Sequence, residues 1–330
     1  MPDVIYPRLF LEVIPEELKN TQPDIKKLIH TQNNDEELRS IYGKIIGSVY
    51  KQNPHSNIGL EFGTYLEPQS MCDVARMLAS SINLDSAIHA IANIFHLHNA
   101  SYYPSLYLSE ERCSISLTFP FKTSTSEFQR RFCLEAGYSF LINMVRLSAS
   151  PDFTLLRACF DFPKPKYAHE YPQVFGKNII FDAPISMIEF DSSYLSMRFN
   201  TSNPTVNKVY LKKNLDEWHT KKTTINFDQQ VVTLMLKYHP ESFNCLSLAK
   251  LMNLSVRGLQ KRLSKNNVTF SELSNRARKE LTKIYFIQEK RSINWTADKL
   301  GFQSRSGFSR YFKMEFNQSP AEFINTHADM

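Results

Sequence analysis

Apolar residues recur with two different periods along this chain, and the change of period divides it. In the first 200 residues, stretches with apolar residues three and four positions apart lie beside stretches in which every second residue is apolar. The first spacing is typical of amphipathic helices and the second of strands with one buried face. From Phe227 onward only the helical spacing occurs. The pattern therefore predicts an α+β domain followed by an all-α domain.

Three helices are expected in the first region. The helical spacing predicts one at Leu38–Val49 and another at Leu84–Phe95, which Asn83 or Asp85 could cap. A long helix is expected after a serine at position 124 or 126. Its predicted buried residues are Phe128, Phe132, Ala136, Phe140 and Met144.

Four strands are also expected in this region. Alternation predicts a strand whose buried side carries Cys113, Ile115, Leu117, Phe119 and Phe121. Three shorter strands are predicted at Leu155–Phe160, Ile179–Asp182 and Ser186–Phe190.

The segment 201–225 is polar and has little apolar periodicity, so we interpret it as the connection between domains. The predicted organisation is a regulatory domain at 1–200, a linker at 201–225 and a helical domain at 226–330.

The last third of the chain contains two similar stretches, Ser255–Leu263 and Ser304–Phe312. Each begins with a serine that can cap a helix, and each carries apolar residues four positions apart. A short apolar helix and a tight turn precede each stretch, at Leu246–Met252 and Trp295–Leu300. Two successive helix-turn-helix units are therefore predicted.

The polar faces of these helices carry the candidate DNA contacts. At about 100° per residue, Leu259 and Leu263 lie on one side and the long polar side chains on the other, and the second helix repeats this. An α-helix fits the major groove, where Arg, Lys and Gln can bind base edges. Two ordinary amphipathic helices are the alternative, but the matching positions favour DNA binding. The predicted DNA-binding residues are Arg257, Gln260, Lys261, Ser264, Arg305, Ser306, Ser309, Arg310 and Lys313.

The distribution of charge supports this interpretation. Residues 223–330 hold 16 Lys and Arg against 9 Asp and Glu, whereas residues 1–222 hold 23 against 24. The formal excess of +6 thus comes from the segment that contains the repeat. A basic surface of this kind can face phosphates.

The segment between the two units, Phe270–Glu289, could form a single helix. Such a helix would be about 30 Å long. Major-groove faces on one side of B-DNA recur about every 34 Å. A connector of this length could place both polar-faced helices on one side of a duplex.

These residues resemble the DNA-binding domain of the AraC/XylS family of transcription regulators. The resemblance covers roughly the last hundred residues and is most specific at Gly301–Phe323. It is carried by Leu248-Ala249, Leu254-Ser255, Leu259 to Leu263, Thr269-Phe270, Arg276, Leu300-Gly301-Phe302, Ser304, Phe308 to Lys313, Ser319-Pro320 and Phe323.

The family resemblance implies base contacts from both polar-faced helices, with three departures from the family pattern. Gly258 lies inside the first helix, where glycine costs about 1 kcal/mol relative to alanine. Asn267 and Asn317 replace glycines that the family usually has, and asparagine tolerates the left-handed conformation. The residues to which the resemblance assigns base contacts are Arg257, Gln260, Lys261, Arg305, Ser306 and Arg310.

The N-terminal region resembles the arabinose-binding-like sensor domain of one AraC subgroup. The resemblance is carried by Ile58–Gly63, Leu84–Phe95 and Tyr171–Phe190. It implies a regulatory domain that senses a ligand or dimerises, and it does not define the effector.

The sequence gives no sign of catalytic or metal chemistry. Nucleophile elbows, glycine-rich phosphate loops and dinucleotide fingerprints are all missing. His96 and His98 would share one face of a strand, but no further ligand lies at a suitable spacing. Cys133 lies in an apolar helical stretch and is expected in the core. We therefore expect no enzymatic activity, metal or cofactor.

A cluster of aromatic residues in the first region could line an effector pocket or fill the core beside the sheet, and we favour the core. The ligand-binding residues are thus left unassigned. The cluster consists of Tyr102, Tyr103, Tyr107, Phe160, Phe162, Tyr167 and Tyr171.

We expect a transcription regulator that binds double-stranded promoter DNA and activates by contacting RNA polymerase. Its N-terminal domain would act through a small-molecule or protein effector, through homodimerisation, or through both. An enzyme with an appended DNA-binding module and a regulator without a small effector are the alternatives. The five scattered cysteines, the lack of a signal peptide and the lack of a membrane span predict a cytoplasmic, nucleoid-associated protein.

Overall fold

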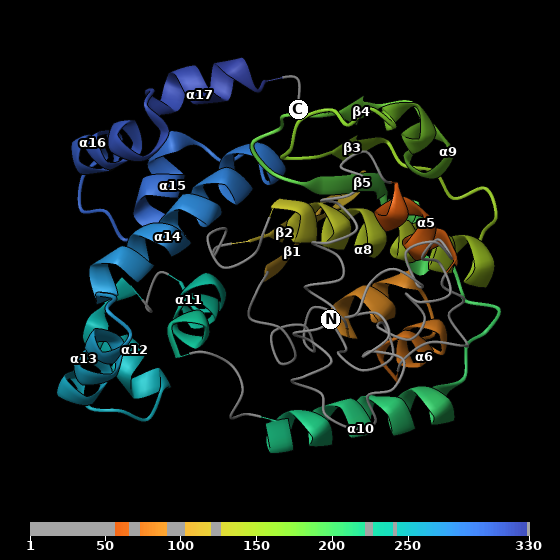
Figure 1. The fold of residues 1–330 in the computed structure, drawn as a ribbon, viewed down its shortest axis with the longest axis horizontal. Helices are drawn as coiled ribbons and strands as arrows, with labels where there is room; N and C mark the ends of the chain where they lie inside the picture. The colour runs from red at the N-terminus through yellow and green to blue at the C-terminus, as the bar shows by residue number, and fades with distance from the viewer. Residues whose placement is uncertain are drawn as a thin grey trace, which may run out of the picture. The chain divides into compact units, whose positions relative to one another are not determined.

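The computed structural model describes residues 57–65, 73–90, 103–119, 127–221, 227–239 and 243–328. The chain forms two compact units. The second unit contains Thr223–Met330 and two short segments within Ala100–Tyr107 and Ser116–Phe121, and the first contains the rest. The first is α+β and the helical region of the second is built as expected, so the predicted fold class is confirmed (Figure 1). The helix expected at Leu38–Val49 lies outside the described residues.

Five strands form one sheet in the order β1-β2-β5-β3-β4. Strand β3 pairs with β4 in parallel, with Ala158 opposite Ile179, and with β5 antiparallel, with Ala158 opposite Ile188. The three short strands expected from the sequence are confirmed; the first two have narrower bounds, and the third is shifted by one residue. The strands are β1 (Tyr103–Leu108), β2 (Arg112–Thr118), β3 (Arg157–Cys159), β4 (Ile179–Ile180) and β5 (Met187–Asp191).

Strand β2 is buried on both faces, which corrects the expectation of a single buried side. Cys113 is buried as predicted, but Ile115 and Leu117 are only half-buried. On the opposite face Ser114 and Ser116 are fully buried. Alternation of apolar and polar residues misses such a face, because small hydroxyl side chains can be buried when they are hydrogen-bonded.

Helix α5 (Ile58–Tyr65) packs closely against the long helix α8 (Glu127–Ser148). Of the five core residues predicted on α8, four are buried and Phe128 is half-buried. The two backbones approach so closely at Gly63 that an added Cβ would lie 2.5 Å from the carbonyl oxygen of Ala136. Gly63 therefore permits this helix pair.

A carboxylate lies fully buried on α8 beside this contact. Glu135 accepts hydrogen bonds from the hydroxyls of Tyr167 (2.6 Å) and Tyr171 (2.5 Å). Burial, and next the negative charge of Glu135, raise the pKa of Tyr171, so its hydroxyl remains a donor. Satisfied in this way, the carboxylate is part of the core.

Those members of the predicted aromatic cluster that the structure describes in the first unit lie in its core, as expected. Phe160 packs edge-to-face against Tyr171, and with a tilt against Phe162. All three side chains and Tyr167 are buried. Tyr102 lies outside the described residues. Helix α9 (Tyr171–Phe175) and the 3-10 helices Ala168–Glu170 and Ser192–Ser196 complete this part of the unit.

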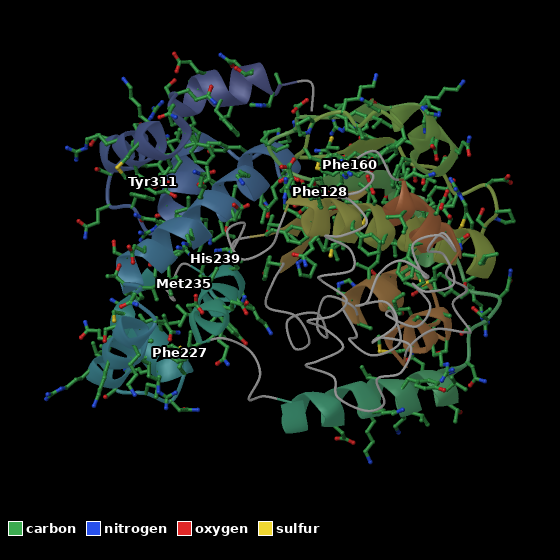
Figure 2. The ribbon with its side chains drawn as sticks, in the orientation of Figure 1. Phe128, Phe160, Phe227, Met235, His239 and Tyr311 are labelled. Carbon is green, nitrogen blue, oxygen red and sulfur yellow. The ribbon has the colours of Figure 1, made fainter. Side chains whose placement is uncertain are left out.

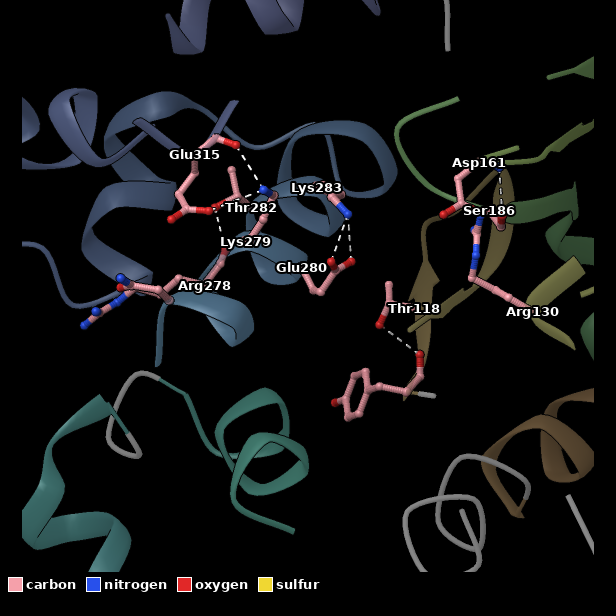
Figure 3. Close-up of polar contacts among 12 residues, drawn as sticks. Thr118, Arg130, Asp161, Ser186, Arg278, Lys279, Glu280, Thr282, Lys283 and Glu315 are labelled. Carbon is pink, nitrogen blue, oxygen red and sulfur yellow. Dashed lines mark hydrogen bonds and ion pairs between the residues drawn. The ribbon is translucent and has the colours of Figure 1, made fainter. Parts of the chain in front are cut away.

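Two ion-paired groups lie beside the sheet. Arg130 on α8 pairs with Asp161, which also accepts from the hydroxyl of Ser186 at 2.6 Å (Figure 3). Glu189 on β5 pairs with Arg112 at 3.0 Å and Arg157 at 2.9 Å. Because each carboxylate has its cation, burial of these charges is tolerated.

Helix α6 (Asp73–Ala79) is followed by a helix that begins at Leu84. The side chain of Asn83 accepts from the backbone N–H of Ser86 at 3.0 Å, which confirms a cap at that position. Residues 91–95 of this predicted helix lie outside the described part of the chain.

The polar segment interpreted as a linker contains helix α10 (Pro204–Lys221). Asn207 donates to the carbonyl oxygen of Met77 at 2.7 Å, and Arg76 donates to Tyr210 at 3.4 Å. Contacts with α6 thus hold a helix that has little apolar periodicity of its own. The domain boundaries at 201–225 stay a prediction.

The second unit contains helices α11 to α17. In Figure 1, α11 to α13 lie at one end of α14 and α15 to α17 at the other. Their bounds are α11 (Phe227–Lys237), α12 (Cys245–Leu251), α13 (Val256–Lys265), α14 (Phe270–Lys283), a π-helix (Ile284–Gln288), α15 (Ile293–Lys299), α16 (Arg305–Phe316) and α17 (Pro320–Thr326). Within the described ranges, none of the helices is both long and apolar enough to span a bilayer.

We predict that Gly63→Ala destabilises the protein by about 1–3 kcal/mol, because the new methyl group overpacks the contact between α5 and α8. Urea unfolding of the full-length protein measures this change. Gly307→Ala is the control: its Cβ meets only the Ser304 hydroxyl at 3.3 Å, and alanine favours the helix. Equal stability of the two variants would show that the close approach at Gly63 does not constrain the fold.

Candidate nucleic-acid interface

The first helix-turn-helix unit consists of α12 and α13. The side chain of Asn244 caps α12 by accepting from the N–H groups of Leu246 (2.8 Å) and Ser247 (3.3 Å). In the turn, the N–H of Leu254 donates to the carbonyl of Ala249 at 2.8 Å. Asn253 in that turn has a φ of +54°, which asparagine tolerates. The predicted unit is thus present.

The second unit, α15 and α16, has the same turn. The N–H of Phe302 donates to the carbonyl of Ala297 at 3.0 Å, and Gly301 has a φ of +75°. Its left-handed residue, donor and acceptor each lie 48 positions after those of the first turn. Gln303 is an extra residue that delays the start of α16 by one position. The repeat seen in the sequence is therefore also a repeat of backbone hydrogen bonds.

Both polar-faced helices begin at the predicted serines. The Ser255 hydroxyl accepts from the N–H of Gly258 at 3.0 Å, and the Ser304 hydroxyl accepts from that of Gly307 at 3.2 Å. Gly258 therefore lies in the first turn of α13, where it makes the same capping bond as its counterpart in α16. The next helices also begin at a cap, since Thr269 and Ser319 both form capping boxes.

The two helices direct their apolar residues inward as predicted. Leu259 and Leu263 of α13, and Phe308 and Phe312 of α16, are all buried. The predicted contact residues lie on the outer faces, where only Ser309 is half-buried. The exposed ones are Arg257, Gln260, Lys261, Ser264, Arg305, Ser306, Arg310 and Lys313.

The cations on these outer faces differ from those behind them. Within the part of the chain that the structure describes, neither Arg257 nor Lys261 of α13 forms an ion pair, and the same holds for Arg305 and Arg310 of α16. Two helices carrying unneutralised charge outward form a surface suited to an anionic partner.

The basic side chains of α14, by contrast, form ion pairs and hydrogen bonds within the protein (Figure 3). Lys279 pairs with Glu315 of α16 at 3.3 Å, and Lys283 pairs with Glu280 at 2.9 Å. Arg278 donates to the carbonyl of Leu300 at 3.0 Å and lies over the ring of Phe243. Lys279 thus joins α14 to α16, and Arg278 joins it to the turn after α15, so these cations serve the protein's own packing.

The connector is not a single α-helix over Phe270–Glu289, which corrects the expectation. Helix α14 ends at Lys283 and continues as a π-helix over Ile284–Gln288, closed by a bond from the N–H of Glu289 to the carbonyl of Ile284. All five π-helix side chains are buried. Burial on every side shows that this segment lies inside the core of the second unit.

Helix α11, which contacts α12 and α13 of the first helix-turn-helix unit, packs against this π-helix together with the second unit. The Tyr285 hydroxyl lies 2.6 Å from Nδ1 of His239, at the end of α11, and its ring packs edge-to-face on Trp295 of α15. Figure 2 shows His239 and Met235 on α11. The adjacent Phe286 contacts the rings of α16 and α17. Residues 284–288 are therefore the joint between the two helix-turn-helix units.

Sequence reasoning missed the left-handed turn residue Asn253 and the buried polar residue Gln288. An asparagine three positions before the start of an expected recognition helix resembles any other loop residue, but alignment of its turn with Gly301 would have identified Asn253. Gln288 had no local signal, because its partners lie far away in the sequence.

The structure also bears on metal binding and nucleophilic chemistry, of which the sequence shows no sign. The described residues contain no group of three or more His, Cys, Asp or Glu able to hold a metal ion, while His96 and His98 lie outside them. Cys133 lies on α8, and burial raises the pKa of its thiol to about 11, so it is a poor nucleophile at neutral pH.

The fold and the repeated units define the class: a two-part DNA-binding protein with an α+β domain and a double helix-turn-helix domain. Residues 41–199 match the family model described as the arabinose-binding domain of AraC transcription regulators, N-terminal, and residues 248–326 match that of a helix-turn-helix domain.

Several relatives from Pseudomonas aeruginosa are similar to this chain. An ornithine utilization regulator is 22% identical over 270 residues, covering 81% of this chain and 78% of the relative. The HTH-type transcriptional regulator VqsM is 22% identical over 286 residues, covering 81% and 83%. The crystal structure of the transcriptional regulator CdpR is 16% identical with a TM-score of 0.48, covering 96% of this chain and 97% of that one.

The chain belongs to the AraC/XylS family of transcription regulators, with an N-terminal arabinose-binding-like domain. This family consists of DNA-binding regulators and not enzymes, so the predictions of family and of a non-enzymatic protein are confirmed.

We predict that Ser304→Ala lowers stability by about 1 kcal/mol, because the first turn of α16 loses its cap. Ser304→Asp should retain wild-type stability, since aspartate caps equally well. Urea unfolding of the full-length variants distinguishes them. A Ser304→Ala protein as stable as wild type would mean that the capping bond contributes nothing in solution.

Proposed function

We propose that this protein binds promoter DNA by placing α13 and α16 in successive major-groove segments. The observation that carries the proposal is a pair of capped helices built on the same turn, whose cations Arg257, Lys261, Arg305 and Arg310 form no ion pair among the described residues. Arg257, Gln260 and Lys261 of the first helix would contact bases, together with Arg305, Ser306 and Arg310 of the second. The remaining predicted contacts, Ser264, Ser309 and Lys313, would position the helices on the backbone.

The regulatory side of the proposal is that the protein activates transcription by contacting RNA polymerase, under control of its N-terminal domain. Control would operate through an effector, homodimerisation or both, and would take place in the cytoplasm on nucleoid DNA. One relative is named for ornithine utilization, which makes small amino acids and amines the first effectors to test.

A genome-wide pull-down tests DNA binding directly. Full-length protein at near-physiological salt should recover discrete promoter fragments, and a protein without residues 223–330 should recover none. Fragments that survive this truncation would contradict the proposal. Repeating the pull-down with candidate effectors, alongside thermal shift of the full-length protein, distinguishes an effector-controlled regulator from one without a small ligand.

We predict that Arg257→Ala and Arg305→Ala each weaken binding to a recovered promoter by about 1–3 kcal/mol, because each removes a contact to a base edge. Fluorescence anisotropy measures the affinity, and footprints show whether one groove segment is lost. Lys265→Ala is the matched control: it removes the same charge from exposed α13, but it lies about 90° around the helix from the middle of the polar face. Unchanged footprints in both arginine variants would exclude this groove assignment.

We also predict a steep dependence of affinity on salt. The logarithm of the association constant should fall with the logarithm of salt concentration by about 0.9 per neutralised phosphate. Titration between low and physiological salt measures the slope, which Lys313→Ala should reduce by about one unit if Lys313 contacts phosphate. A slope near zero would contradict direct binding to the DNA backbone.

A further inference from the structure

The ends of strands β1 and β2 belong to the second unit, where they contact its helices. The Tyr103 hydroxyl donates to the carbonyl of Leu236 on α11 at 3.2 Å. The Ser116 hydroxyl donates to Oε1 of Gln288 at 2.8 Å, and Nε2 of Gln288 donates to the carbonyl of Ser105 at 3.3 Å. These segments come from the arabinose-binding-like region, yet they are bonded to the DNA-binding helices.

The Gln288 amide joins both strand ends. A backbone carbonyl can only accept, so the carbonyl of Ser105 must face the amide nitrogen, which leaves the amide oxygen for Ser116. Both Ser116 and Gln288 are fully buried. Thr118 donates to the carbonyl of Tyr103 at 3.3 Å, which fixes the two strand ends to each other (Figure 3).

The position of this contact gives it significance. Gln288 is the last residue of the π-helix, against which α11 and the second helix-turn-helix unit pack. Leu236 lies in the last turn of α11, which leads into the first unit. Short π-helical turns within helices frequently occur at functional sites. The strand ends therefore bond to both the π-helix and α11.

We propose that the strand ends and the π-helix form the contact through which the N-terminal domain controls the separation of the two recognition helices. This inference rests on the proposed function. Strands β1 and β2 continue into the five-stranded sheet, so a displacement of those strands moves the Gln288 amide. An effector acts through this contact if it favours one arrangement of the strands over another.

Two full-length variants test the contact. Gln288→Met keeps the length of the side chain but removes both amide bonds, and Ser116→Ala removes one of them. Ser148→Ala is the matched control, because Ser148 is an equally buried serine on α8 of the first unit. Circular dichroism establishes that each variant is folded, and Ser116→Ala serves if Gln288→Met is not.

Hydrogen exchange and DNA affinity provide the two readouts. In Gln288→Met we expect amide hydrogen exchange over Ile284–Gln288 to become about ten times faster, because the loss of a buried hydrogen bond changes an opening equilibrium by about that factor. Affinity for a recovered promoter fragment should fall about tenfold, whereas affinity for fragments with one scrambled groove segment should not change. Ser116→Ala should shift both readouts less, and the control should shift neither.

Other results would overturn the inference. Unchanged exchange in both variants would show that the strand ends do not hold the joint. Faster amide exchange with unchanged DNA affinity would show that the contact does not set the separation of the recognition helices. An equal loss of affinity for intact and scrambled fragments would show that the contact only supports folding. If wild type binds no fragment, the proposed function fails, while hydrogen exchange still shows whether the strand ends dock.

Discussion

The DNA-binding unit depends on the burial of one short segment, the π-helix Ile284–Gln288. Its side chains are buried, and they contact the end of α11 as well as α15, α16 and α17 of the second helix-turn-helix unit. Tyr285 links the end of α11 to α15, and the neighbouring Phe286 enters the aromatic core of α16 and α17. The distance and angle between α13 and α16 therefore follow from how this segment is wound and packed. A regular helix at this position would give a different angle between the two units.

Charge in this unit is divided between structure and surface. The cations of α14 are used inside the protein: Lys279 joins α14 to α16, and Arg278 lies between the ring of Phe243 and the turn at Leu300. Burial lowers the pKa of Arg278, yet a guanidinium keeps its charge at neutral pH, so it can serve as a fixed hydrogen-bond donor there. Arg257, Lys261, Arg305 and Arg310 of the two recognition helices form no ion pair in the described chain, and their field is available to an external anion. The same residue type thus has two roles, and position on the helix decides between them.

The sequence predicted the parts of this fold that depend on local pattern. Helix caps at Ser255 and Ser304, the buried pairs four residues apart and the left-handed turn at Gly301 all follow from short-range rules, and the structure has each of them. The outward direction of Arg257 and Arg305 follows from helical periodicity in the same way. The π-helix could not be predicted, because its winding is imposed by elements distant in sequence. The burial of the serine face of β2 was missed for the same reason, since hydroxyl side chains read as solvent-facing until their partners are known.

The missed features also include the contact of the β1 and β2 ends with the π-helix, all of which lie in the second unit. Short-range sequence patterns predict individual helices and strands. A contact between distant segments, by contrast, uses residues that are not required for the core of either element. A serine on a strand and a glutamine at the end of a helix are such residues, because each is tolerated in its element and neither is needed for its core. Once paired and buried they cannot separate without leaving polar atoms unsatisfied, which makes the contact specific in geometry.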